Sequence, residues 1–136
     1  MAQLFSDAWM KQFAKAWNND PKMVMPLANA QFSSNVAYGF TGEEKPRGII
    51  VIKNGKVEHA GLYVDEPVNW DLRASFENWR IWLESGFGLS RLGPAVAMGK
   101  LKFVTGDYRK MIRNPATSAP FLRHFVIMSE IKTTFK

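Results

Sequence analysis

The chain contains 136 residues, of which 46% are hydrophobic, and it has no cysteine. This length suits one domain with a full hydrophobic core, and the lack of cysteine excludes disulfides and thiol chemistry. The formal net charge of +6 favours anionic partners in general, such as acidic lipid surfaces or anionic small molecules.

The first third of the chain predicts two helices. Ser6 is a favourable N-cap for a helix over residues 6–18. The aromatic residues here recur every three or four positions and so share one face: Phe5, Trp9, Phe13 and Trp17. A second helix over residues 22–28 is expected to be brief, because Pro26 interrupts it.

Short strands follow in the middle of the chain. One is predicted over residues 32–40 and another over residues 69–74. Between them, Asn54-Gly55 separates two apolar runs within residues 49–64. This pair favours the tight type I′ turn of a hairpin, because both residues tolerate a positive φ angle.

Two further helices and one strand are predicted next. The first helix runs from its N-cap Ser75 to Leu83, and the second covers residues 89–98. The strand after them places apolar and basic residues on opposite sides: Leu101 and Phe103 on one, Lys100 and Lys102 on the other.

Two helices complete the chain. Asp107 is expected to cap a short helix through Arg113, and a last helix begins at Ser118 and carries an apolar stripe. This order of elements predicts a single α+β domain over residues 1–136, with helices on one face of a mostly antiparallel sheet.

Four segments together resemble the sterol carrier protein domain, the type-two lipid-transfer family. They are the aromatic N-terminal helix, the hairpin, the aromatic helix after Ser75, and the stretch Met98-Gly99-Lys100-Leu101-Lys102-Phe103-Val104-Thr105-Gly106-Asp107. That stretch is similar to the family's glycine-lysine-leucine-lysine strand ending in glycine-aspartate. The resemblance covers nearly the whole chain and indicates a stand-alone bacterial or archaeal member. It implies a five-stranded sheet and an apolar tunnel for sterols, fatty acyl chains or other lipids, with no catalytic residue and no cofactor.

The candidate tunnel residues are the large apolar side chains on the helices and strand around this stretch: Phe76, Trp79, Trp82, Leu83, Phe87, Met98, Leu101, Phe103, Phe121, Phe125 and Met128. The abundance of methionine also suits an adaptable apolar pocket. Basic residues are expected to hold an anionic head group or to contact an anionic membrane transiently: Arg91, Lys100, Lys102 and Arg123. The same residues equally fit an ordinary core and a solvated basic face.

Catalytic signals are weak. His59 and His124 are the only histidines, neither has the spacing of a metal site, and both are expected at the surface or at a pocket rim. Gly86-Phe87-Gly88 lacks the third glycine of a phosphate-binding loop, and no glycine-serine turn of the hydrolase kind is present. We therefore predict a protein that binds a small apolar ligand, is not an enzyme and holds no metal.

Two alternatives stay open. The same fold with a filled core would serve as an interaction module, either a homodimer or a complex subunit, with the edge strand and the face of Trp9 and Trp17 as its contact surfaces. An enzyme acting on a bound lipid would need a polar trio, and His59, His124 and Asp107 are the residues to test.

Nucleic acid and membrane insertion are not expected. The basic residues are not interleaved with exposed aromatic residues as in nucleic-acid-binding modules. No apolar run reaches the roughly 18 residues that a membrane span needs, and the first residues lack the pattern of a secretion signal. The expected location is the cytoplasm.

Overall fold

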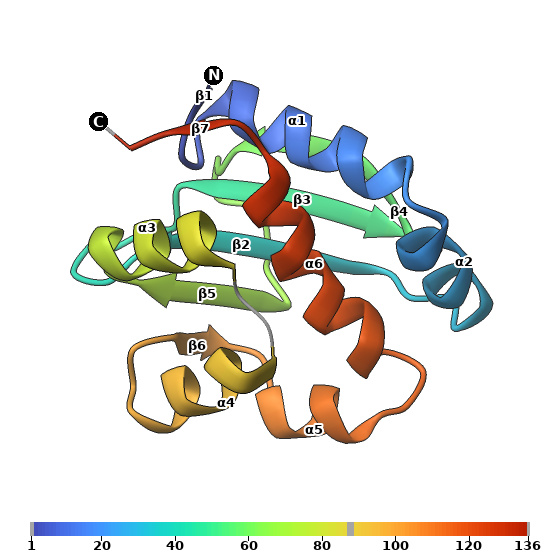
Figure 1. Ribbon diagram of the computed structural model, residues 1–136. Coiled ribbons are helices and arrows are strands. Elements are labelled where there is room, and N and C mark those ends of the chain that lie inside the picture. Colours follow the sequence, from blue (N-terminus) through green and yellow to red (C-terminus); the bar gives the residue numbers. More distant parts are fainter. Residues whose placement is uncertain (1, 87–88, 136) are drawn as a thin grey trace.

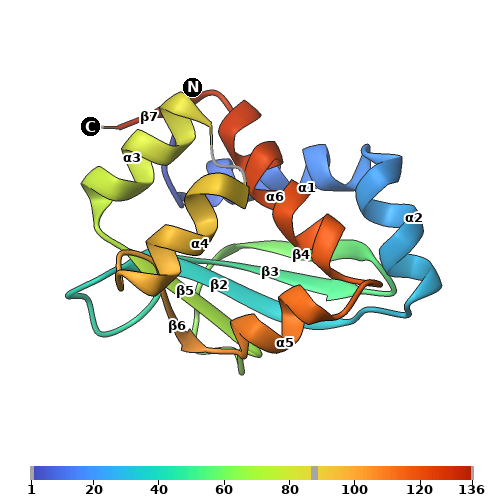
Figure 2. The same cartoon turned by 60° about the horizontal axis from the view of Figure 1, so that its bottom comes forward.

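A computed structural model describes residues 2–86 and 89–135. At its centre is a five-stranded sheet in the order β4-β3-β2-β5-β6, with helices covering one face (Figures 1 and 2). Neighbouring strands are antiparallel except β2 and β5, which run parallel. The expected α+β class is therefore confirmed. The strands are β2 (Ser34–Phe40), β3 (Gly48–Lys53), β4 (Lys56–Leu62), β5 (Trp70–Ala74) and β6 (Lys102–Thr105).

The predicted β3–β4 hairpin is confirmed. It turns at Asn54 and Gly55, whose φ angles of 49° and 87° are both positive, as a type I′ turn requires. Helix α1 (Asp7–Asn18) packs against this hairpin. The indole N–H of Trp17 donates a 2.9 Å hydrogen bond to the Gly55 carbonyl.

The two N-terminal helices form on the predicted segments. In α1, the Ser6 hydroxyl accepts a 3.2 Å hydrogen bond from a backbone N–H of the first turn. Helix α2 (Pro21–Asn29) differs from the expectation, because it continues through Pro26. Pro26 removes only one backbone donor from the helix, and the buried side chains of Met23 and Leu27 fasten α2 to the core.

Four helices occupy the second half of the chain, as predicted. Asp107 accepts a 3.1 Å hydrogen bond from a backbone N–H of the helix that it caps. The last helix runs across the middle of the sheet in Figure 1, so its inward side chains face β2 and β5. The four are α3 (Phe76–Ser85), α4 (Leu89–Ala97), α5 (Tyr108–Arg113) and α6 (Ser118–Glu130).

A parallel pair of very short strands was not predicted. Strand β1 (Ala2–Gln3) lies beside β7 (Thr133–Thr134), which brings the two ends of the described chain together (Figure 1). The indole N–H of Trp9 donates a 2.8 Å hydrogen bond to the Thr133 hydroxyl and reinforces this pair. Strands of two residues have no periodicity that a sequence pattern could reveal.

Candidate ligand-binding site

A small internal cavity lies between the sheet and α6. Its walls include Val36 and Tyr38 of β2, Leu72 of β5, and Phe121 and His124 of α6. The cavity volume is about 30 Å³, which is enough for an ordered water molecule. Pockets for small ligands usually measure about 300–1,000 Å³. The described residues therefore form a nearly filled core, and an open tunnel is not among the features that they show.

Two uncharged polar side chains stand on the wall of this apolar cavity. Tyr38 is fully buried, and its hydroxyl has no hydrogen-bond partner among the described residues. The Nδ1 atom of His124 is hydrogen-bonded to the Phe121 carbonyl, and the imidazole is only 3% exposed. The two ring centroids are 6.0 Å apart.

Burial sets the protonation of both groups. Loss of solvation raises the pKa of the Tyr38 hydroxyl well above its ordinary value. The same loss lowers the pKa of His124 to about 4, although the hydrogen bond to Phe121 opposes the shift. Both side chains are therefore neutral at pH 7, and the cavity wall presents polarity without charge.

The unpaired Tyr38 hydroxyl contrasts with the indole donors around it. Trp17 donates to the Gly55 carbonyl, Trp9 to the Thr133 hydroxyl, and Trp79 to the Gly39 carbonyl at 2.9 Å. Buried side-chain donors are normally satisfied in this way. The Tyr38 hydroxyl is thus an exception that lies at the cavity wall.

A surface cleft of about 360 Å³ adjoins the cavity near α5 and the start of β5. Four residues line both spaces and therefore stand between them: Phe32, Trp70, Met111 and Thr117. Lys110 also lines the cleft. Movement of the side chains in this shared wall would join the cleft to the cavity.

Gly106 keeps the backbone close to Trp70 in this wall. A Cβ atom at Gly106 would lie 2.2 Å from the nearest Trp70 ring atom, and the Gly106 φ angle is 107°. Gly106, the glycine of the Gly106-Asp107 pair in the family-like stretch, therefore allows the β6–α5 turn to pack directly on the Trp70 indole.

We expect Gly106→Ala to lower the free energy of unfolding by about 2 kcal/mol, because it adds this clash to an unfavourable φ angle. Gly42→Ala is the matched control: its φ angle is 92°, but no atom lies within 4 Å of an added Cβ. The control should lose about 1 kcal/mol from backbone strain alone. Urea unfolding measures the loss of unfolding free energy in both variants. Equal losses would show that the contact between residue 106 and Trp70 is unimportant.

The expected tunnel residues do not gather around one space. Of the eleven, Phe121 lines the internal cavity. Phe103 is half-buried beside it, with ring centroids 6.1 Å apart. The other buried residues pack in the general core, outside the lining of this cavity: Trp79, Trp82, Leu83, Leu101, Phe125 and Met128.

Two of the expected tunnel residues are exposed, and a third lies outside the described residues. Met98 is 68% exposed, which is contrary to its expected place in a tunnel, because it follows the end of α4 and lies on the surface. Phe76 is 36% exposed at the start of α3. Phe87 lies outside the described residues.

The expected head-group residues lie apart from one another. Arg91 and Lys100 line one surface hollow, and Lys102 lines another, between β6 and α5. Arg123 forms a 2.7 Å ion pair with Asp20, which connects α6 to the α1–α2 turn. None of these four residues lines the cleft that adjoins the internal cavity.

The two histidines have different environments. His59 is exposed on β4, as expected. The expectation for His124 was wrong, because this side chain is buried on the inward face of α6. Its neighbours in sequence, Arg123 and Phe125, do not reveal which helix face turns inward, so the sequence signal was ambiguous.

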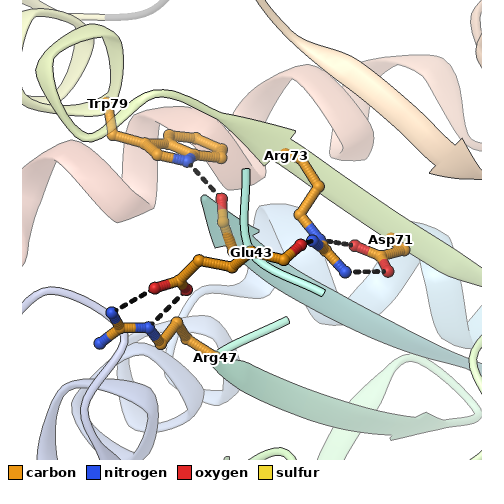
Figure 3. Close-up of polar contacts among 6 residues, drawn as sticks. Glu43, Arg47, Asp71, Arg73 and Trp79 are labelled. Atoms are coloured by element: carbon orange, nitrogen blue, oxygen red, sulfur yellow. Dashed lines mark hydrogen bonds and ion pairs between the residues drawn. The ribbon is translucent and has the colours of Figure 1, made fainter. Parts of the chain in front are cut away.

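A second polar cluster was not predicted. On β5, Asp71 and Arg73 alternate with the cavity-facing Trp70 and Leu72, so they lie on the opposite face of the sheet. The carboxylate of Asp71 accepts two hydrogen bonds from Arg73, at 2.6 and 2.9 Å, and both side chains are buried (Figure 3).

This buried pair also holds a loop. The Nη1 group of Arg73 donates a 2.8 Å hydrogen bond to the Glu43 carbonyl, within the loop between β2 and β3 (Figure 3). The Glu43 carboxylate in turn accepts two hydrogen bonds from Arg47, which lowers its pKa. The i, i+2 spacing of Asp71 and Arg73 within a strand was the sequence signal for the pair.

The described residues lack two features. They contain no group of three or more histidine, aspartate or glutamate side chains placed to hold a metal ion. Within the same residues, every helix is too short or too polar to cross a bilayer.

Comparisons with known proteins identify the fold. The sequence matches no protein-family model and no curated protein. The crystal structure of sterol carrier protein 2 superposes with a TM-score of 0.72 and 14% identity, over 96% of this chain and 100% of that one.

Two further solved structures agree with this result. A conserved hypothetical protein from Thermus thermophilus has a TM-score of 0.68 and 16% identity, over 98% of this chain and 93% of its own. The UbiJ-SCP2 ubiquinone synthesis protein has a TM-score of 0.57 and 11% identity, over 88% of this chain and 86% of its own. The resemblance inferred from the sequence is therefore confirmed at the level of the fold: this chain has the sterol carrier protein 2 fold.

Proposed function

We propose that this protein binds and transfers a lipid-like ligand in the space between β2, β5 and α6, without catalysis. One observation carries the proposal: an apolar cavity lies under α6, and only a wall of side chains separates it from a surface cleft. The shared fold with proteins named sterol carriers supports an apolar ligand.

Binding requires the cavity to expand, because about 30 Å³ cannot hold a lipid. Met111 is unbranched and adaptable, and Trp70 is half-buried, so these two side chains of the shared wall are the ones we expect to move. Burial of apolar ligand surface, at about 25 cal/mol per Å², supplies the driving force. The cost of opening the wall and of association opposes it.

Native mass spectrometry of the protein purified from cells would detect a retained lipid. In parallel, the neutral dye N-phenyl-1-naphthylamine should bind and be displaced by 1-dodecanol, with a dissociation constant on the order of 1 μM. If no lipid is retained and 1-dodecanol displaces no dye, the carrier function is refuted.

A single added methyl group tests the location. Val36 lines the cavity, so Val36→Ile should weaken 1-dodecanol binding about fivefold and change the free energy of unfolding by less than about 1 kcal/mol. Val51→Ile makes the same change on β3, on the face of the sheet opposite the cavity-lining Ile52. Equal affinities for the two variants would place the ligand elsewhere.

The nearly filled core also favours a second candidate, an interaction module such as a homodimer. Of the two contacts expected for it, the face of Trp9 and Trp17 is unavailable, because both side chains are buried. The sheet edges at β4 and β6 would then be the contact surfaces. Light scattering after size-exclusion chromatography should show a dimer if this candidate is right, together with no displacement of dye.

A further inference from the structure

Strand β6 forms an open edge of the sheet. It pairs with β5 alone, and outside that pairing the described part of the chain makes no hydrogen bond to the backbone of residues 102–105. An edge strand presents a row of N–H and C=O groups with which another extended chain can pair. The opposite edge is less open, because α1 packs against β4 and the Asn18 amide pairs with both the N–H and the C=O of Val57.

A groove lies beside this edge. Its volume is about 650 Å³, and it is lined by the end of α4, by β6 and by the first turn of α5, in the lower part of Figure 1. The lining is mainly apolar and includes the half-buried rings of Phe103 and Tyr108, whose centroids are 5.3 Å apart. Val104 has no partner on β5, and its side chain is 61% exposed. The groove therefore offers contact to apolar side chains of a bound chain.

The surroundings of the groove carry the net positive charge of the protein. Residues 89–129 contain seven lysine and arginine residues and one acidic residue, Asp107, so their net charge equals the +6 of the whole chain. The Asp107 carboxylate is already used as the cap of α5. Five of the cations around β6 and α5 are exposed and form no ion pair within the described chain: Lys100, Lys102, Arg109, Lys110 and Arg113.

We propose that β6 and its groove bind an acidic, extended segment of another protein as an added strand. The backbone of the segment pairs with the open edge of β6, and an apolar side chain enters the groove. Its carboxylates face Lys102 and Arg109, which line the groove. In this mode of recognition, main-chain hydrogen bonds give affinity and side chains give specificity. The proposal goes beyond the carrier function and does not depend on it.

The same features disfavour a second copy of this chain as the partner. Pairing of β6 with its own copy would bring like charges together at Lys102 and Arg109, and like charges on paired strands are destabilising. The register shift at Val104 is a bulge that limits the length of any pairing. Main-chain bonds alone are therefore few, and the surrounding charges decide which strand is accepted.

A phosphate surface is a poorer match than an acidic peptide. The phosphates of a nucleic acid or of a bilayer would attract the same cations. They would leave the N–H and C=O groups of the strand edge and the apolar groove without partners. A peptide supplies carboxylates, a backbone and apolar side chains together.

The probe is a terminally blocked hexapeptide that alternates glutamate with valine, titrated into the whole protein and followed by backbone amide NMR shifts. We expect a dissociation constant on the order of 100 μM, with the largest shifts at β6. Two control peptides keep the length: one has lysine in place of glutamate, and the other has N-methylated backbone nitrogens that cannot donate. Both should bind at least about tenfold more weakly.

A charge reversal on the protein tests the location. Lys102→Glu should weaken binding of the hexapeptide about tenfold. Lys53→Glu makes the same change at an exposed position on β3, outside the groove lining, and should alter the affinity by less than about twofold. Equal affinities for these two variants would overturn the assigned location.

Other results would overturn the partner class. Absence of peptide binding, or equal binding of the N-methylated peptide, would exclude an added strand. Tighter binding of a thymidylate hexamer or of phosphatidylglycerol vesicles than of the hexapeptide would show that the basic face recognises phosphate instead. The carrier function is tested separately by dye displacement, so it stands or falls independently of these results.

Discussion

Asp71→Ala is expected to lower the free energy of unfolding by about 3–5 kcal/mol, a larger loss than the breaking of any exposed ion pair would cause. The change leaves the Arg73 guanidinium buried, with the Glu43 carbonyl as its remaining partner in Figure 3. The cost arises from the unpaired buried charge. Urea unfolding at neutral pH measures it.

Two further variants separate this explanation from a general effect of removing charge. Asp71→Val combined with Arg73→Met replaces the pair with apolar side chains and should recover most of the lost stability. Lys45→Ala breaks the ion pair between Lys45 and Asp65, whose side chains are 62% and 68% exposed. It should lower the free energy of unfolding by at most about 1 kcal/mol. A loss of similar size in Asp71→Ala and Lys45→Ala would contradict the assigned role of the buried pair.

His124 should make stability fall with acidity. Its pKa is about 4 in the folded protein, because burial disfavours the charged imidazolium, and about 6.5 in the unfolded chain. Above pH 6.5 the side chain is neutral in both states, and its contribution to stability is fully present. As the pH falls from 6.5 to 4, only the unfolded chain gains the proton, so about 3 kcal/mol of stability is lost.

Urea unfolding at pH 7 and pH 5 tests this directly. The wild type should lose about 2 kcal/mol through His124 between these two values. His124→Gln should remove that part of the loss, whereas His59→Gln, at an exposed position, should keep it. Retention of the full pH dependence in His124→Gln would show that other groups cause it.

The local structure of this protein followed from its sequence. Asn54-Gly55 predicts the hairpin, because few other pairs tolerate two positive φ angles. Ser6, Ser75 and Asp107 mark helix starts, because their side chains satisfy backbone donors that a helix leaves unpaired. The glycine-aspartate pair at residues 106–107 also indicated the fold, and Gly106 now has a physical role against Trp70.

Most of the residues that line the cavity could not be predicted from the sequence. Of the expected tunnel residues, Phe121 lines the cavity, while Tyr38 was not singled out at all. Aromatic spacing identifies an inward face but not which inward residues meet across the core. The expected basic head-group site and the buried, uncharged Tyr38–His124 pair lie in different parts of the molecule.

The amino-acid sequence by itself determined the helices, the hairpin and the resemblance to sterol carrier proteins, because caps, turns and periodicity act over a few neighbouring residues. Tertiary structure alone decided that β2 and β5 run parallel, that α6 turns His124 inward, and that Tyr38 remains unpaired. These features depend on contacts between segments far apart in the chain. Local sequence patterns are compatible with several such arrangements, and packing and desolvation determine which of them is most stable.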